Sequence, residues 1–386
     1  MNVRTNGTAV LRRDKKVQQD LVRDAGLRAV RQAAGSNLEE VEPFLRNESY
    51  PVVVKPVESA GSDGVQLCHT YDEARQHFLR LSNARNQCGG INSSVLCQEF
   101  LRGKEYVVDQ VSRNGVHKTT MVWVYDKRPA NGAAFVYFGC VPVDSQSPEA
   151  QLIIPYVRSV LDALGVKNGP SHGEVMMTPS GPCLVEMNVR AHGGDGNWMP
   201  LVRALTGYSQ VDASVDAYLD EKRFGELPDR PPSPFRAAGQ EVILVSYSRG
   251  TVNSTPGFDA IRRLESFLYL ETSVEIGSKV ERTTDLFTCI GSAILVHPDA
   301  DAVERDIRRI REMEENDELF VYEAGGGRVG GGELFRSPSV LNQLSFSSDL
   351  DAVAEKGDLS PSAAAPPAAA SAHRRVISSD RMDIFW

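Results

Sequence analysis

The sequence lacks the features that would assign it to a membrane or to an oxidising compartment. No run of about 18 apolar residues occurs, and the opening MNVRTNGTAVLRRDKK has no apolar stretch of the kind found in signal peptides. The six cysteines, at 68, 88, 97, 140, 183 and 289, form no CxxC pair, so neither a zinc site nor a disulfide framework is indicated. We therefore predict a cytoplasmic protein with reduced thiols and no membrane contact.

Positive charge is also scarce. The chain has 42 lysines and arginines against 51 acidic residues, a net charge of −9. Nonspecific binding of nucleic acid needs a basic surface, so we predict no nucleic-acid partner. A nucleotide is compatible with this balance because it needs only a few well-placed cations.

What is present is enough chain for a large core, with 386 residues of which 41% are hydrophobic. Helix and strand signals are mixed, which predicts an α+β fold. Asp14 begins a helix that Gly26 ends, and Ser36 and Thr70 each open a helix with a capping box. Further helices are expected over 148–164, 199–205 and 210–219, and strands over 51–55, 65–68, 94–100, 106–111, 118–125 and 134–138.

Two acids flank a turn in the segment GEVMMTPSGPCLVEMNVRAHGG, residues 173–194. If strands 171–178 and 182–190 pair around a turn centred on Ser180, the numbers of paired residues sum to 360. The predicted pairs are Glu174 with Glu186, His172 with Asn188, and Met176 with Leu184. Because side chains alternate along a strand, one face is polar and the other apolar. The polar face carries His172, Glu174, Glu186, Asn188 and Arg190, and the apolar face Val175, Met177, Cys183, Val185, Met187 and Val189.

The opposed acids indicate a metal site. Like charges about 5 Å apart repel by about 3 kcal/mol at an effective dielectric of about 20, and a cation between them removes this cost. Oxygen donors from Glu174, Glu186 and Asn188 suit Mg²⁺ or Mn²⁺. Arg190, one step further, is placed to bind a phosphate or carboxylate. The alternative interpretation is a solvated charged face. Zinc is disfavoured because Cys183 is expected on the opposite face.

Two upstream segments could hold a nucleotide. In VVVKPVESAGSDGV, residues 52–65, Lys55 ends a buried strand and precedes a loop able to close over phosphates with Ser59, Gly61, Ser62 and Gly64. It is not a Walker A loop. In CQEFLRGKEYVVDQV, residues 97–111, a strand end at Glu99, Phe100 and Leu101 can offer backbone groups to an adenine, and Glu105 can accept ribose hydroxyls. Taken alone, each segment is better explained as an ordinary connection between strands.

Taken in order, these segments resemble the ATP-grasp superfamily over about residues 12–220. Residues 256–321 are more loosely similar to the closing subdomain of its L-amino acid ligase (carboxylate–amine ligase) branch. The resemblance implies two α+β lobes that sandwich ATP. The implied domains are an N-terminal helix remnant at 1–27, a small lobe at 28–104, a large lobe with the metal-binding hairpin at 105–235, a small α+β subdomain at 236–335, and a disordered tail at 336–386.

The resemblance also implies roles for the candidate residues. Lys15 and Lys55 would contact the ATP phosphates, and the 59–64 loop would cover them. Glu99, Phe100 and Leu101 would meet the adenine, and Glu105 the ribose. Glu174, Glu186 and Asn188 would bind two Mg²⁺ ions, and Arg190 would stabilise the transferred phosphoryl group. The implied reaction converts a small-molecule carboxylate and ATP to an acyl phosphate, which an amine then attacks.

Several alternatives stay open at this point. Relatives carry a preATP-grasp domain ahead of the Lys15 helix, and its expected absence here leaves an ATP-binding pseudoenzyme or regulatory module as the second hypothesis. A carboxylase or a purine-biosynthesis ligase on the same fold is the third. Trp198 either edges the acceptor pocket with the preceding glycines or packs as an ordinary core residue. A homodimer is compatible with everything above.

Overall fold

Two of the sheets in this protein frame the candidate site, within the residues that the computed structural model describes: 5–7, 14–58, 62–87 and 89–327. The chain divides into two compact units, Met1–Glu333 and Leu334–Trp386, and all described residues belong to the first. Ser59, Gly61 and the predicted tail lie outside the described residues.

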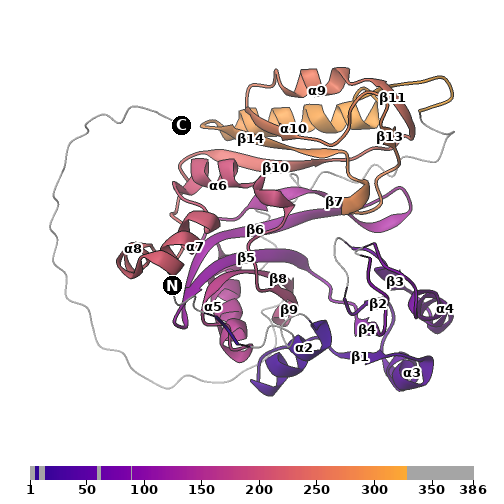
Figure 1. Cartoon of the computed structure of the whole chain (residues 1–386), viewed down its shortest axis with the longest axis vertical. Helices are drawn as coiled ribbons and strands as arrows, with labels where there is room; N and C mark the ends of the chain where they lie inside the picture. Colours follow the sequence, from indigo (N-terminus) through magenta and orange to yellow (C-terminus); the bar gives the residue numbers. More distant parts are fainter. Residues whose placement is uncertain (1–4, 8–13, 59–61, 88, 328–386) are drawn as a thin grey trace, which may run out of the picture. The chain divides into compact units, whose positions relative to one another are not determined.

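The smaller sheet has the strand order β1-β4-β2-β3 (Figure 1). Its strands are β1 (Gln32–Gly35), β2 (Val52–Pro56), β3 (Gln66–Cys68) and β4 (Val95–Glu99). Helices α3 (Leu38–Asn47) and α4 (Tyr71–Leu81) pack on it. Leu45, Val54 and Phe78 are fully buried in the shared core, which holds Lys55 at the end of a fixed strand.

The helix starts in this lobe follow local capping, with one correction. Thr70 caps α4 as predicted, because its hydroxyl accepts from the Glu73 N–H. The cap of α3 is Asn37, not Ser36. Asn37 has the extended backbone of a cap residue, and its side-chain oxygen accepts from the Glu40 N–H. Ser36 instead donates its N–H to the Glu40 carboxylate.

The larger sheet is antiparallel with the order β12-β14-β10-β7-β6-β5-β8-β9. Its strands are β5 (Lys104–Arg113), β6 (Val116–Ala130), β7 (Ala133–Pro142), β8 (Gly169–Thr178), β9 (Gly181–Asn188), β10 (Ala238–Leu244), β12 (Phe267–Glu271) and β14 (Gly291–His297). One sheet thus runs across the boundary expected near residue 235. The domain limits given above remain predictions.

Helices cover both faces of this sheet. Helix α5 (Pro148–Ala163) packs on one face, where Ile153, Val157 and Leu161 meet Val108 and Val175. Helix α6 (Met199–Thr206) packs on the other.

The remaining helices that the structure describes are α7 (Gln210–Leu219), α8 (Glu221–Glu226), α9 (Pro256–Ile261) and α10 (Ala300–Glu315). A third sheet is formed by β11 (Gly250–Ser254), β13 (Lys279–Val280) and β15 (Val321–Tyr322).

Helix α2 (Lys15–Asp24) closes the outer edge of β9. Asp14 caps the helix by accepting from two backbone N–H groups. The Gln18 side chain then donates to the Met187 carbonyl at 2.8 Å and accepts from the Met187 N–H at 2.9 Å. Gln19 donates to the Leu184 carbonyl at 2.9 Å. These two amides satisfy backbone groups that an edge strand otherwise leaves unpaired.

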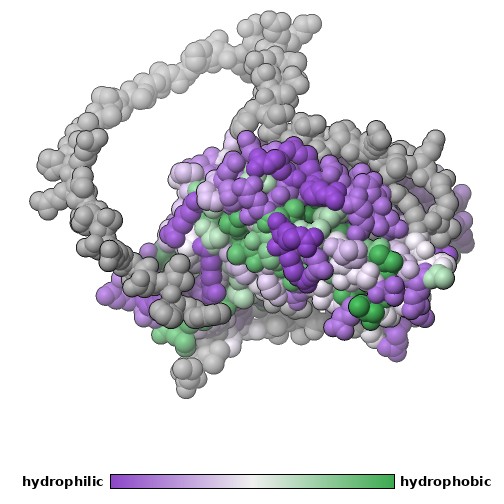
Figure 2. Space-filling model, turned by 90° about the horizontal axis from the view of Figure 1, so that it is seen from above, coloured by the Kyte–Doolittle hydropathy of each residue, from purple (hydrophilic) through white to green (hydrophobic). Residues whose placement is uncertain are grey.

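The surface is mixed in character. Figure 2 shows, from above, the side of the molecule that carries α9 and α10 at the top of Figure 1, with an apolar area bordered by hydrophilic residues. Among the described residues, no helix combines the length and the apolar character needed to cross a membrane.

Candidate active site

A cavity lies between the two sheets, and residues from both line it. Its void, including the part open to solvent, measures about 1080 Å³. The predicted site residues that line it are Lys15, Lys55, Ser62, Glu99, Phe100, Leu101, Glu105, Glu174, Glu186, Asn188 and Arg190. Residues predicted from four separate segments therefore meet in one place.

Gly64 is the exception among the described candidates, because it does not line the cavity. Its φ is +69°, and a Cβ at this position would lie 3.0 Å from Leu81 and 3.1 Å from Pro56. Packing and backbone conformation therefore both require glycine here. The Gly64 carbonyl lies 2.8 Å from Nε2 of His77, which fixes the end of the loop to α4.

The hairpin of β8 and β9 places the acids as predicted. Glu174 pairs with Glu186 and His172 pairs with Asn188. The predicted pair of Met176 with Leu184 is wrong. The register shifts by one residue beyond Glu174, so β9 carries an extra residue at this point, which is a β-bulge.

The bulge reassigns the residues next to the turn. Leu184 pairs with Val175 and lies in the core, whereas Cys183 pairs with Met176. Paired residues share a face, so Cys183 lies on the side of Glu174 rather than on the apolar face. Val185 lines the cavity instead of the core. The reason given above for disfavouring zinc therefore fails, although Cys183 belongs to no metal-binding cluster of the described residues.

Basic groups of the protein compensate both acids. Lys15 Nζ lies 3.2 Å from Glu186 Oε1, and His172 Nε2 lies 3.4 Å from Glu174 Oε1. Burial raises the pKa of Glu174, but the hydrogen bond from His172 and the charge of Lys127 outweigh it and hold the pKa below its usual value. The repulsion expected from the sequence is thus relieved by basic groups of the chain itself.

Lys55 and Arg190 add positive charge in different ways. Burial and the nearby charge of Lys15 lower the pKa of Lys55 to about 8, against the opposing effect of Glu186. Arg190 is exposed, and its Nη1 donates to the Ala191 carbonyl at 2.8 Å. One cation is therefore held inside the cavity, and the other stands at its rim.

Lys127 is a cavity residue that sequence reasoning missed. Its Nζ donates to both oxygens of Glu105, at 2.8 and 2.7 Å, and lies over the rings of Tyr125 and Tyr137. Burial raises the pKa of Glu105 despite this pairing. The alternation along β6 places Lys127 and Tyr125 on one face, but nothing in the sequence connects that face to Glu105.

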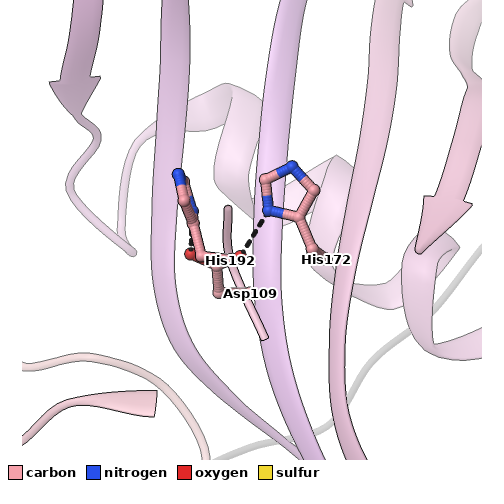
Figure 3. Close-up of side chains that lie close together, drawn as sticks. All are labelled: Asp109, His172 and His192. Atoms are coloured by element: carbon pink, nitrogen blue, oxygen red, sulfur yellow. Dashed lines mark hydrogen bonds and ion pairs between the residues drawn. The ribbon is translucent and has the colours of Figure 1, made fainter. Parts of the chain in front are cut away.

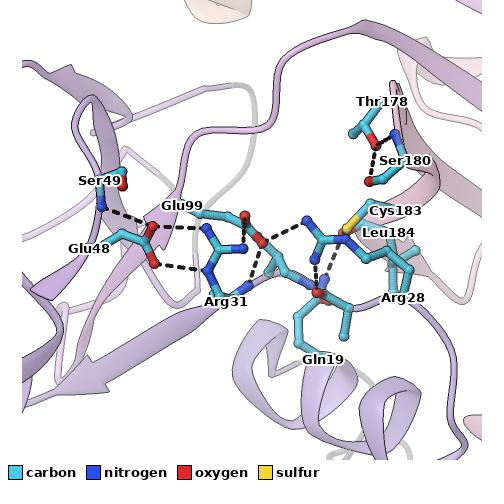
Figure 4. A network of polar contacts seen from close by, with 12 residues as sticks. Gln19, Arg28, Arg31, Glu48, Ser49, Glu99, Thr178, Ser180, Cys183 and Leu184 are labelled. Atoms are coloured by element: carbon cyan, nitrogen blue, oxygen red, sulfur yellow. Dashed lines mark hydrogen bonds and ion pairs between the residues drawn. The ribbon is translucent and has the colours of Figure 1, made fainter. Parts of the chain in front are cut away.

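The Glu99 carboxylate is occupied by two arginines at the end of β4 (Figure 4). Arg28 lies 2.9 Å and Arg31 2.8 Å from its oxygens, and Arg31 also contacts Glu48 at the end of α3. This network fixes the connection between the two sheets. The Glu99 N–H also donates to the Arg31 carbonyl at 3.0 Å, whereas the following Phe100 and Leu101 line the cavity.

A buried acid, Asp109, was also missed. Its Oδ1 lies 2.9 Å from His172 Nδ1, and its Oδ2 lies 2.8 Å from His192 Nδ1 (Figure 3). Burial raises the pKa of Asp109, but both imidazoles outweigh it and hold the pKa well below the usual range. Burial lowers the pKa of His172, but Asp109 and Glu174 raise it to about 9.

Trp198 proves to be a packing residue. It is 2% exposed and belongs to the core beneath α6, where its Nε1 donates to the Gly193 carbonyl at 2.7 Å. Its place after Arg190 in the sequence therefore reflects support of the loop, not a pocket edge.

Comparison with known proteins gives three informative similarities. A family model described as an ATP-grasp domain matches residues 48–198. Dapdiamide A synthase of Enterobacter agglomerans is 30% identical over 307 residues, which cover 78% of this chain and 71% of that protein. Phosphoribosylamine–glycine ligase of Rhodopirellula baltica is 30% identical over 193 residues, covering 47% of this chain and 43% of that protein.

Among solved structures, an L-amino acid ligase from Bacillus licheniformis has the same fold. It aligns with a TM-score of 0.65 and 19% identity, over 81% of this chain and 73% of that chain. At this identity the likeness concerns only the arrangement of helices and strands.

Proposed function

Because this chain belongs to the ATP-grasp family, we propose that it is an ATP-dependent ligase that joins a small-molecule carboxylate to an amine. The predicted family and the α+β ATP-grasp fold are confirmed. One of these relatives is a synthase by name and two are ligases, and they give no support to the pseudoenzyme hypothesis. By analogy with alanine–anticapsin ligase of Bacillus subtilis, which is 24% identical over 234 residues and names an amino acid as its substrate, we infer amino-acid-like substrates.

One observation carries the proposal. Three cations, Lys15, Lys55 and Arg190, line the same cavity as the opposed pair Glu174 and Glu186. Cations alone would suit any anion, and acids alone any metal. Both together suit a polyphosphate that arrives with a divalent ion.

The donors in the cavity fit magnesium. Glu174, Glu186 and Asn188 offer carboxylate and amide oxygens, the ligands that Mg²⁺ and Mn²⁺ prefer. Members of the family use ATP with Mg²⁺. When bound, the ion supplies neutralisation of phosphate charge.

The remaining roles belong to the chain's own groups. We assign Lys15 and Lys55 to the phosphates, and the 59–64 loop to their cover. The backbone at Glu99, Phe100 and Leu101 is assigned to the adenine, and Glu105 to the ribose. Arg190 is assigned to the transferred phosphoryl group. Catalysis of this kind needs positioning and charge stabilisation, not a side-chain nucleophile.

The reaction has two steps. A carboxylate oxygen attacks the γ-phosphorus of ATP, the bond to the β-phosphate oxygen breaks, and ADP leaves. The amine nitrogen then attacks the acyl carbon, phosphate leaves, and the nitrogen loses a proton to give the amide. Arg190 at the rim can hold phosphoryl oxygens in both steps.

Release of phosphate tests the proposal. With Mg²⁺, ATP and mixtures of amino acids, the parent protein should release phosphate and ADP. Glu186→Gln should reduce this release by at least about 100-fold, because it removes a carboxylate that we assign to the ion. Glu271→Gln, an exposed glutamate on β12, serves as the control.

Two outcomes would count against the assignments. Parent-like turnover of the Glu186→Gln variant would overturn the metal site. Stabilisation of the parent by Mg·ATP, without phosphate release from any mixture of carboxylates and amines, would replace the ligase with a nucleotide-binding module.

A further inference from the structure

Asp109, His172 and His192 form a cluster beside the proposed metal site. They come from β5, from β8 and from the loop after β9, and their ligand atoms all lie within 4.8 Å of one another (Figure 3). Asp109 is 1% exposed and His172 2%. A cluster this deeply buried must be explained by what its members hold in place.

The cluster has the geometry of a hydrogen-bonded anchor. Besides the two imidazoles, Asp109 accepts from Trp123 Nε1 at 2.7 Å. An ionised carboxylate can only accept, so Nδ1 of each histidine carries the proton that faces it. Both oxygens of Asp109 are thus bound by N–H donors, and the second nitrogen of each ring is left to act elsewhere.

The first of the two histidines, His172, contacts a carboxylate that we assign to the metal. Asp109 and His172 are paired residues of β5 and β8, and His172 in turn pairs with Asn188 on β9. His172 Nε2 lies 3.4 Å from Glu174 Oε1 and 3.2 Å from the Tyr125 hydroxyl. Fixing the His172 ring therefore fixes one of the carboxylates assigned to the metal.

The second histidine, His192, lies in the loop that carries Arg190. His192 follows it by two residues, and its ring packs against Trp123 and Trp198, with centroids at 5.5 and 5.2 Å. The backbone N–H of His192 donates to Gln210 Oε1 at 2.8 Å. These contacts fix the backbone just after Arg190, whose own side chain is exposed.

We propose that Asp109 is a positioning residue for both halves of the site. Through His172 it orients Glu174 toward the divalent ion, and through His192 it holds the loop that carries Arg190. The inference rests on the proposed function, because it concerns the same metal and the same phosphoryl transfer.

Asp109→Asn tests the proposal with almost no change in shape. The amide keeps one acceptor but presents an N–H₂ group to one imidazole, so that ring must turn or change tautomer. Loss of such an outer partner typically costs about 10- to 100-fold in metal affinity or activity. We expect a loss of this size in the Mn²⁺ affinity of the ADP-bound protein and in kcat.

Asp126→Asn provides the matched control. Asp126 is also buried, on the neighbouring strand β6, but it pairs with Arg128 and does not line the cavity. It should lose comparable stability and keep the Mn²⁺ affinity of the parent. Equal Mn²⁺ affinity in both variants would overturn the proposal.

Kinetic measurements separate the role of His172 from that of His192. His172→Gln should raise the Mg²⁺ concentration needed for half-maximal activity by about tenfold or more. His192→Phe, which keeps the packing between the tryptophans, should lower kcat with little change in that concentration. Adding Asp109→Asn to His192→Phe should lower kcat by less than the product of the single effects. If the decrease in kcat of the double variant equals the product of the two single decreases, Asp109 does not act through His192.

A readout without metal or activity completes the test. In ¹⁵N-histidine NMR spectra of the metal-free parent, both rings should show a protonated Nδ1, and Asp109→Asn should shift these signals. This measurement on the parent, together with His192→Phe, keeps the test decisive if Asp109→Asn does not fold. Zinc bound stoichiometrically by the purified parent would overturn the proposal, because the cluster would then be a metal site itself.

Binding of Mn²⁺·ADP distinguishes a failure of the positioning role from a failure of the proposed function. If the parent binds Mn²⁺·ADP and Asp109→Asn binds it equally well, the positioning role is wrong and the ligase assignment stands. If the parent itself does not bind Mn²⁺·ADP, the proposed function is wrong and the positioning role is wrong with it.

Discussion

Lys55 shows how a single buried residue can make nucleotide binding depend on pH. Its pKa of about 8 means that the ammonium is half lost at pH 8, nearly complete about one pH unit below and nearly absent about one pH unit above. Phosphate oxygens bind the ammonium form, because only that form is charged and carries a full set of donors.

We predict that the Kd for Mg·ADP is nearly constant up to about pH 7 and about doubles by pH 8. It should then rise by up to about tenfold per pH unit above pH 8, because the protein must take up a proton to bind. Calorimetric titrations at several pH values measure this. In Lys55→Arg the guanidinium stays charged, so the rise should flatten. An identical profile in both proteins would assign the titration to another group.

At the same scale, some of the site could be predicted and some could not. Glu174, Glu186 and Asn188 were found because a two-residue period and a turn place them within one hairpin. Asp109 and Lys127 were not, because their partners are distant in sequence: His172 is 63 residues from Asp109. Pairing of β5 with β8 and β6 creates these contacts, and a single strand carries no signal for its neighbours.

At the scale of elements, α2 and β9 depend on each other. The amide of Gln18 is 1% exposed and bonds both backbone groups of Met187, next to Glu186. An apolar replacement would leave a buried N–H and a buried carbonyl without this partner.

We predict that Gln18→Ala lowers the free energy of unfolding by about 2–4 kcal/mol, since each buried group left unsatisfied costs about 1–3 kcal/mol. Urea denaturation measures this. Lys16→Ala, an exposed position on the same helix, should change it by less than about 0.5 kcal/mol. Equal effects of the two substitutions would show that the hydrogen bonds between Gln18 and Met187 contribute little to stability.

Element prediction from the sequence succeeded for most helices and strands with a local signal. Caps and periodicity located α2, α4 and α5, but Ser36 was preferred to Asn37 as the cap of α3. A bulge has no comparable local signature. One inserted residue in β9 leaves composition and alternation nearly unchanged, so the register could be predicted only up to Glu174.

At the scale of the molecule, the cavity needs both sheets. Lys55 belongs to the smaller sheet and Glu174 to the larger one. A ligand that touches both sheets binds only the folded protein, so its binding free energy adds to stability.

We predict that Mg·ADP at about 100 times its Kd raises the free energy of unfolding by about 2.7 kcal/mol. Thermal denaturation should show a shift of several degrees. EDTA should remove most of it, because without the ion the carboxylates assigned to it repel the phosphates of ADP. A shift of the same size with EDTA would contradict the metal assignment.

The bulge in β9 also bears on how relatives should be recognised. Eleven residues separate Glu174 from Glu186, and one of them is the extra residue that the register shift accommodates. A homologue with a regular hairpin would align the same acids with one residue fewer. Searches that require a fixed number of residues between these glutamates would therefore miss true homologues. A pattern that tolerates one inserted residue there would retrieve them.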